Sequence, residues 1–144
     1  MNSTHQLVEF TSNHWELSLA FVGITILIIF NELRARLGSA QQLGPHAATQ
    51  LMNADEAVIL DVREDSEFTQ GHLANARHIP LGQLATRLGE LEKFRDRKII
   101  AYCRTGNRSA NAAQLLNKQG FMSVYNLAGG IVAWQNANLP VTKK

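Results

Sequence analysis

The sequence predicts an α/β domain with a central parallel sheet and helices on both faces, preceded by one membrane-spanning helix. From about residue 41 onwards, short apolar runs alternate with amphipathic stretches, which is the order expected of a parallel sheet with crossover helices. An earlier segment, Leu17 to Phe30, is apolar except for three small residues. Because 45% of the 144 residues are hydrophobic, the chain can bury a core, and we expect one domain plus this N-terminal appendage.

Residues 15–36 are expected to form a transmembrane anchor that follows a polar tail at residues 1–14. A helix from Trp15 to Leu33 would rise about 28 Å at about 1.5 Å per residue, so residues 15–33 could cross the lipid core. Trp15 stands at one edge, where interfacial aromatic residues gather, and Arg34 and Arg36 flank the other. The positive-inside rule then predicts a single-pass protein with its N-terminus outside and its domain in the cytoplasm.

Two other interpretations of this segment stay open. Its strictly apolar part is short, and a run of that length also occurs in the buried core helix of a soluble protein. A cleaved signal peptide normally starts with positive charge, whereas residues 1–14 contain no Lys or Arg. The aromatic and arginine flanks favour the membrane anchor over both alternatives.

The first half of the domain is predicted to contain two helices and three strands. Residues 37–44 would link the anchor to the domain, which spans residues 45–144, and would include an edge strand at residues 41–44. Pro45 suits the first position of a helix, which should run to about Asn53. The apolar run Ala57–Val62 predicts a buried strand. A short helix at residues 64–69 should be closed by Gly71, and a further strand should stop at Pro80.

In the second half, four leucines recur at helical spacing and predict helical structure between Leu81 and Leu91. Residues 98–102 form the predicted central strand, followed by a helix from Ser109 to Lys118. Residues 123–127 form another strand. Gly129 and Gly130 should then turn the chain into a last helix at residues 131–136.

Cys103 is the only cysteine, and it stands between the predicted central strand and the helix after it. In open parallel sheets, ligands bind beyond the carboxyl ends of the strands, and amides at a helix N-terminus favour an anion. Gly106 supplies backbone freedom for such a loop. We therefore expect a readily ionised, nucleophilic Cys103 in an anion-binding nest. The predicted binding residues of this nest are Arg104, Thr105, Gly106, Asn107, Arg108 and Ser109.

The composition argues against nucleic-acid binding and against metal or disulfide sites. A formal net charge of +2 gives no reason to expect nucleic acid as a partner. One cysteine excludes an intramolecular disulfide and a cysteine-rich metal cluster, and the five histidines show no metal-ligand spacing. We therefore expect no metal site.

Four segments together resemble one family. They are Asp61-Val-Arg-Glu64, Gly71-His-Leu-Ala-Asn-Ala-Arg-His-Ile-Pro80, the loop Cys103–Arg108, and Gly129-Gly-Ile-Val-Ala-Trp134. In this order and spacing they resemble a single-domain rhodanese, a sulfurtransferase, over residues 41–141. The single N-terminal span is similar to that of membrane-anchored bacterial members, which implies the inner membrane. Asn75 departs from the glycine usual in the second segment, but Asn tolerates left-handed backbone, so the turn should survive.

The resemblance implies a rhodanese-like three-layer fold and covalent catalysis in two half-reactions that need neither a metal nor an organic cofactor. The Cys103 thiolate would take the outer sulfur of thiosulfate or a related donor as a persulfide. Cyanide in an assay, or a cellular thiol or protein, would then accept that sulfur. Asp61, Arg63 and His72 would have structural roles near the site, with Asp61 and Arg63 joined as an ion pair.

Other functions compete with this one. Cys103 could be a buried structural thiol, although its place in a loop rich in Gly and Arg favours catalysis. A cysteine phosphatase has five residues between its Cys and Arg, whereas four separate Cys103 from Arg108. We expect this loop to turn Arg108 inward toward an anion. The domain could also be a docking module for an integral membrane partner, because sulfur transfer alone needs no membrane.

Overall fold

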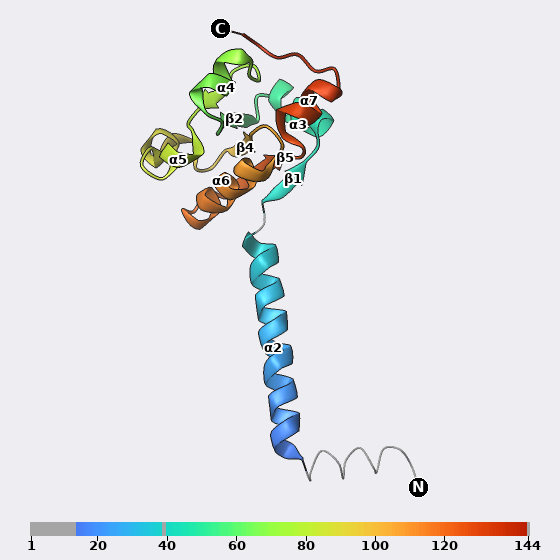
Figure 1. The fold of residues 1–144 in the computed structure, drawn as a ribbon. Coiled ribbons are helices and arrows are strands. Elements are labelled where there is room, and N and C mark those ends of the chain that lie inside the picture. Colours follow the sequence, from blue (N-terminus) through green and yellow to red (C-terminus); the bar gives the residue numbers. More distant parts are fainter. Residues whose placement is uncertain (1–13, 39, 144) are drawn as a thin grey trace. The chain divides into compact units, whose positions relative to one another are not determined.

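The computed structural model describes residues 14–38 and 40–143 (Figure 1). The chain divides into two compact units between Leu37 and Gly38. Helix α2, Trp15–Gly38, makes up nearly all of the described part of the first unit and ends one residue beyond it, so the apolar segment continues as helix through the polar stretch after it. Its apolar side chains are solvent-exposed, for example 72% for Phe21 and 67% for Leu27. Among the described helices, α2 alone is long and apolar enough to cross a membrane, over Trp15–Glu32, a test that a signal sequence also passes.

The second unit is built on a five-stranded parallel sheet with the strand order β1-β5-β4-β2-β3. The strands are β1 (Gln41–Leu43), β2 (Ala57–Asp61), β3 (Arg77–His78), β4 (Lys98–Tyr102) and β5 (Ser123–Leu127). Because all five run in the same direction, the loops after β2, β4 and β5 emerge at one edge of the sheet. The site of any ligand is expected at that edge.

Helices cover both faces of this sheet, as predicted. They are α3 (Pro45–Asn53), α4 (Asp65–Gln70), α5 (Leu81–Leu84), α6 (Asn107–Lys118) and α7 (Gly130–Asn136). The alternation of side chains along β4 sends Ile99 into a core with α5 and α6, and Ile100 into a core with α3 and α7. In Figure 1, α3 and α7 accordingly lie together, away from α5 and α6. The domain has three layers.

The leucine-rich stretch differs from a continuous helix. It consists of α5 followed by two 3₁₀ turns, η1 (Leu88–Glu90) and η2 (Glu92–Phe94). Gly82 and Gly89 weaken a continuous helix here, since glycine costs about 1 kcal/mol in a helix interior. The leucine spacing still serves its purpose, because Leu84 and Leu91 are fully buried.

One local prediction, that Asn75 tolerates a left-handed backbone, is confirmed. Asn75 adopts a left-handed backbone with φ of 59°, a conformation that glycine also adopts readily. The indole N–H of Trp134 donates to the carbonyl of Pro140 at 2.9 Å, which satisfies this polar atom in the core. Helix α6 begins at Asn107, two residues earlier than predicted, because Gly106 already breaks the strand direction with φ of 103°.

Candidate active site

Cys103 follows the last residue of β4, and its side chain forms the floor of the loop that leads into α6. The backbone N–H of Gly106 donates to Cys103 Sγ at 3.1 Å, and the hydroxyl of Ser109 lies 3.4 Å from the same atom. Gly106 reaches this geometry through its left-handed φ, which a residue with a side chain rarely adopts. Cys103 is only 1% exposed, so the thiol is buried beneath its loop, with hydrogen-bond donors directed at it.

These contacts decide the ionisation of the thiol. Burial of Cys103 raises its pKa, but hydrogen bonds from the Ser109 hydroxyl and from the amides of Ser109, Gly106 and Thr105 lower it. The hydrogen bonds outweigh the burial, and the pKa of Cys103 lies below the ordinary value for a thiol. A thiolate is the nucleophilic form of cysteine, so the loop favours reactivity.

Helix α7 aims the amides of the loop. The N–H of Ile131 donates to the carbonyl of Cys103 at 2.9 Å, and the N–H of Val132 donates to that of Arg104 at 3.2 Å. In a trans peptide unit the carbonyl and the following N–H point in opposite directions. Fixing these two carbonyls on α7 therefore turns the N–H groups of Arg104 and Thr105 away from α7 and toward the interior of the loop.

The Gly129-Gly130 pair allows the start of α7 to lie this close to the cysteine loop. Gly130 has φ of 60°, and a Cβ atom on it would collide with the backbone of Cys103 and Arg104. Sequence reasoning found Gly129 and Gly130 as a family element but did not reveal their contact with the cysteine loop.

Arg108 makes a different contact from the one expected. Its guanidinium forms two hydrogen bonds with the carboxylate of Glu67 on α4, at 2.7 and 2.8 Å. Hydrogen bonding to Arg108 lowers the pKa of Glu67 to about 2. Arg108 thus ties the start of α6 to α4, and its charge also interacts with that of Cys103. Glu67 was not predicted, and no local pattern marks it, because the two residues are 41 positions apart.

The remaining loop residues lie at the rim. Arg104, Thr105 and Asn107 are exposed, whereas Gly106 and Ser109 are buried. The predicted binding residues therefore fall into two groups. Gly106 and Ser109 contact the sulfur, whereas Arg104, Thr105 and Asn107 are exposed to solvent.

Asp61 and Arg63 form the expected buried ion pair next to the site. Arg63 Nη2 lies 2.6 Å from Asp61 Oδ2 and also donates to the carbonyl of Gly71 at 2.8 Å. His72 Nδ1 lies 3.1 Å from the carbonyl of Phe68, and the His72 ring stacks on the Phe68 ring. These contacts connect the loop after β2 to the segment around Gly71, which agrees with structural roles for all three predicted residues.

A cavity of about 340 Å³ opens beside the cysteine loop. Its lining includes Arg63, Glu67, Arg104, Ile131, Val132 and Gln135. The rim residue Arg104 and the first turn of α7 therefore face the same space. The cavity is large enough for a small anionic donor next to the loop.

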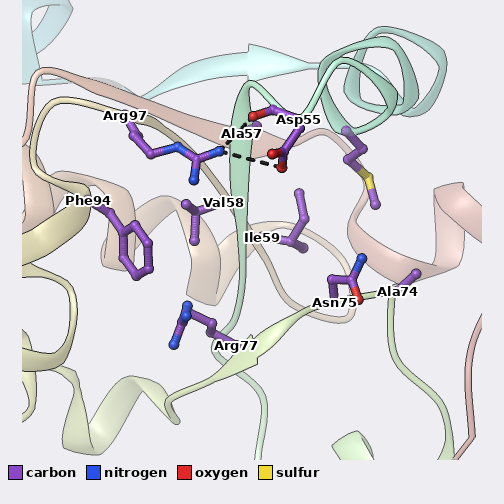
Figure 2. Close-up of a pocket in the computed structure, with 10 residues that line it drawn as sticks. Asp55, Ala57, Val58, Ile59, Ala74, Asn75, Arg77, Phe94 and Arg97 are labelled. Atoms are coloured by element: carbon purple, nitrogen blue, oxygen red, sulfur yellow. Dashed lines mark hydrogen bonds and ion pairs between the residues drawn. The ribbon is translucent and has the colours of Figure 1, made fainter.

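A second cavity, of about 210 Å³, lies at the opposite edge of the sheet (Figure 2). It is lined by the start of β2 at Ala57 and by Arg97, which directly precedes β4. Figure 2 shows Arg97 bonded to Asp55, whose carbonyl accepts from Arg97 Nη2 at 2.6 Å. Because Cys103 lies at the carboxyl end of β4, this cavity is remote from the thiol. Within the described residues, no group of three His, Cys, Asp or Glu side chains could hold a metal ion.

Comparisons with known proteins agree with this geometry. The family described as the Rhodanese-like domain matches residues 44–137. The chain is 27% identical over 139 residues to YibN, an uncharacterized protein of Escherichia coli, covering 96% of this chain and 97% of that one. It is also 35% identical to the thiosulfate sulfurtransferase GlpE of Shewanella oneidensis, over 71% of this chain and 99% of GlpE.

A solved structure shows the same fold. The crystal structure of a rhodanese-related protein from Thermoplasma volcanium superposes with a TM-score of 0.66 at 31% identity, covering 72% of this chain and 99% of that one. The matched family segment includes the cysteine loop, Glu67 and the Gly129-Gly130 turn. On sequence and on structure, the chain belongs to the rhodanese-like domain family.

Proposed function

We propose that this protein is a membrane-anchored sulfurtransferase that carries sulfane sulfur as a persulfide on Cys103. The observation that carries the proposal is the set of hydrogen-bond donors on Cys103 Sγ, which comprises the Gly106 amide and the Ser109 hydroxyl. GlpE, a relative of similar length to the domain, is named a thiosulfate sulfurtransferase, and a relative in Allochromatium vinosum is named a sulfurtransferase. Both names support sulfur transfer as the reaction type.

The reaction has two balanced steps. In the first, the Cys103 thiolate attacks the outer sulfur of thiosulfate, the S–S bond of the donor breaks, and sulfite leaves with the electron pair. In the second, an acceptor nucleophile attacks the outer sulfur of the persulfide, and the pair returns to Cys103 Sγ. The acceptor is cyanide in an assay and a low-molecular-mass or protein thiol in the cell. The ring formed by residues 104–109 stabilises the negative charge of both states.

Sulfur transfer is favoured over phosphate hydrolysis by the size of this ring. Only four residues separate Cys103 from Arg108, and the Arg108 guanidinium is already bonded to Glu67. A phosphate needs more room and a free guanidinium, whereas one sulfur atom needs neither.

The anchor and its topology are part of the proposal. Residues 15–36 would span the bacterial inner membrane after a short outer tail, residues 37–44 would link, and residues 45–144 would work in the cytoplasm. The exposed apolar surface of α2 supports lipid contact through residues 15–33. Arg34 and Arg36, which follow the apolar run, support the cytoplasmic side for the domain.

The direct test uses the full chain in detergent or vesicles. Thiosulfate and cyanide should give thiocyanate, and thiosulfate alone should add the mass of one sulfur atom to the Cys103 peptide. Cys103→Ser should abolish both signals. Thiocyanate formation at the same rate by Cys103→Ser would remove the proposal.

A second function is a docking module for an integral membrane protein, with catalysis secondary. It is motivated by α2, whose apolar side chains have no partner in the described unit. Crosslinking in native membranes compares the two proposals. A partner that is captured equally by wild type and Cys103→Ser, together with an unchanged cellular phenotype, would support docking as the main role.

A further inference from the structure

Asn126, a residue of β5, lies behind the cysteine loop and makes three polar contacts there. Its side-chain oxygen Oδ1 lies 2.6 Å from the hydroxyl of Ser109. Its nitrogen Nδ2 donates to the carbonyl of Gly106 at 3.0 Å and to Oε1 of Gln42 at 3.2 Å. Asn126 is only 3% exposed, so these contacts form in a desolvated environment where their geometry matters most.

The orientation of the Asn126 amide follows from its partners. A backbone carbonyl can only accept, so the group facing Gly106 must be the NH₂ of Asn126. The other end of the amide is then an oxygen, and the Ser109 hydroxyl must donate to it. Gln42 reinforces this orientation from β1, where it is the register partner of Asn126 in the sheet.

Ser109 has a single hydroxyl proton and three acceptors within reach. Besides Asn126 Oδ1 at 2.6 Å, they are the Gly106 carbonyl at 3.2 Å and Cys103 Sγ at 3.4 Å. While the sulfur is uncharged, the short contact to Asn126 is the best bond available to that proton. When the sulfur carries negative charge, a charge-assisted bond to Sγ becomes stronger than a neutral one.

We propose that Asn126 is a positioning residue that competes with Cys103 for the hydroxyl proton of Ser109. The proton lies on the Asn126 side while Sγ is a thiol or the inner atom of a persulfide. It turns to Sγ when Sγ is a thiolate. The Ser109 hydroxyl therefore donates either to Asn126 or to Cys103, and the strength of its bond to Asn126 determines which acceptor it favours.

This inference rests on the proposed function and adds a step to its second half-reaction. As the acceptor nucleophile attacks the outer sulfur, the S–S bond breaks and its electron pair moves to Sγ. The hydroxyl of Ser109 turns from Asn126 to Sγ at this point and stabilises the leaving thiolate. No proton is gained or lost by Ser109, so the step is a rotation and needs no co-reactant.

Four charged side chains near Cys103 are left unaltered in the test of this proposal. The charge of Arg108 in α6 interacts with that of Cys103, and Glu67 of α4 is bonded to Arg108. Arg63, after β2, and Arg104, in the loop, line the adjacent cavity. None of these residues is altered below, so a change in thiol ionisation caused by a neutral substitution reports on the hydroxyl. The one substitution that adds a charge, Asn126→Asp, is present in both proteins that it is used to compare.

The experiment measures thiol ionisation without any sulfur transfer. The rate of Cys103 alkylation by iodoacetamide is followed against pH in the full-length protein. Ser109→Ala should raise the pKa of Cys103 by about one unit, the effect of losing one hydrogen bond to a charged group. Asn126→Leu, nearly the same size, should lower it by several tenths of a unit, because the hydroxyl is released to the sulfur. The Gly106 carbonyl keeps the Ala110 amide as a partner at 3.1 Å, so leucine leaves no orphaned acceptor there.

The double variant carries the decisive comparison. In the Ser109→Ala background, Asn126→Leu should leave the pKa unchanged, since no hydroxyl remains to be released. Asn111→Leu, the same substitution at an exposed position of α6, should leave it unchanged in either background. A purely structural role for Asn126 predicts the opposite sign, because a loosened loop would raise the pKa.

Two results would overturn the inference. One is a raised or unaltered pKa in folded Asn126→Leu, and the other is an effect that persists without Ser109. If Asn126→Leu does not fold, Asn126→Asp replaces it, because a carboxylate would hold the hydroxyl. Ser109→Ala should then have no effect on the pKa in the Asn126→Asp background, and an undiminished effect would refute the proposal. These pKa measurements do not depend on sulfurtransferase activity. The proposed function and the proposed role of Asn126 can therefore be refuted independently.

Discussion

Glu67 and Arg108 form a two-point ion pair beside the cysteine loop, with N–O distances of 2.7 and 2.8 Å. The pair joins α4 to the first turn of α6, the helix whose start shapes the amide ring around Cys103. Both side chains are about one-third exposed, at 27% and 34%, so the pair is neither fully buried nor freely solvated. The ion pair should therefore help to hold the start of α6 in place as well as contribute to the free energy of unfolding.

Glu67→Gln should lower the free energy of unfolding by about 1 kcal/mol at pH 7, a value typical of a partly exposed ion pair. The pKa of Glu67 is about 2 in the fold, below about 4.3 for a free Glu side chain. The stabilisation is therefore complete above about pH 4.3 and is lost as the pH falls toward 2. Urea unfolding at pH 7 and at pH 2.5 should show that the free energies of unfolding of the wild type and the variant converge at the lower pH.

The control is Glu90→Gln, which breaks an exposed ion pair with Arg87 and should have a smaller effect on the free energy of unfolding. An equal loss at both pH values would contradict the linkage.

Gly130→Ala should reduce both stability and the reactivity of Cys103. Its φ of 60° disfavours a side chain, and the new Cβ would push against the backbone of Cys103 and Arg104. We expect a loss of about 2 kcal/mol or more in the free energy of unfolding, with slower alkylation of the thiol. Gly82→Ala is the matched control, since nothing lies within 4 Å of a Cβ there. Normal thiol reactivity in a folded Gly130→Ala protein would show that α7 does not aim the loop.

The rate of Cys103 alkylation should reach half of its maximum at a pH below the ordinary pKa of a free thiol. Burial raises the pKa of Cys103, and the Ser109 hydroxyl and three loop amides lower it by a larger amount. Alkylation rates across pH 5 to about 10 measure this directly, because only the thiolate reacts. A midpoint at or above the value for free cysteine would mean that burial wins over the hydrogen bonds.

Arg63→Met should be strongly destabilising, by about 3–5 kcal/mol, because it leaves the Asp61 carboxylate buried without its partner. Asp61 is fully buried and Arg63 is 4% exposed. Arg97→Met, a control at the other edge of the sheet, removes a half-exposed contact to Asp55 and should cost much less. The comparison uses thermal unfolding of the two variants. Equal destabilisation would show that the buried pair has no special weight.

Phe21→Arg combined with Leu27→Arg should release the protein from membranes. An arginine near the centre of a spanning helix costs about 2.5–3.5 kcal/mol, and two exceed what a single short span can tolerate. Carbonate extraction of membranes followed by fractionation gives the readout. Met122→Arg, at an exposed apolar residue of the domain, should remain in the membrane fraction. Retention of the double variant would argue against a lipid-spanning role for α2.

The four sequence segments that resemble rhodaneses identified the fold, but they did not reveal how those segments meet. Gly129 and Gly130 marked the last helix correctly, whereas their packing on the cysteine loop depends on the order of β4 and β5 in the sheet. Asn126 had no distinguishing pattern, because a polar residue in a strand is ordinarily solvent-facing. Its role emerged only when β5 placed it next to Ser109, 17 positions away in the chain.

Arg108 illustrates the same limit on a single residue. The loop length differs from the cysteine phosphatase pattern, and that is visible in the sequence, yet the contact of the arginine depends on Glu67, a carboxylate in another helix. Sequence spacing describes the ring, but not the partners that surround it.

By itself, the sequence determined an apolar N-terminal helix, an alternating α/β domain, and a lone cysteine at the tip of a buried strand. Each of these follows from local periodicity, from glycine and proline positions, and from short-range order along the chain. Only the tertiary structure decided that α7 orients the loop amides, that Arg108 binds Glu67, and that Asn126 faces Ser109. The physical reason is that hydrogen bonds between distant segments depend on strand order and register, which a linear pattern does not encode.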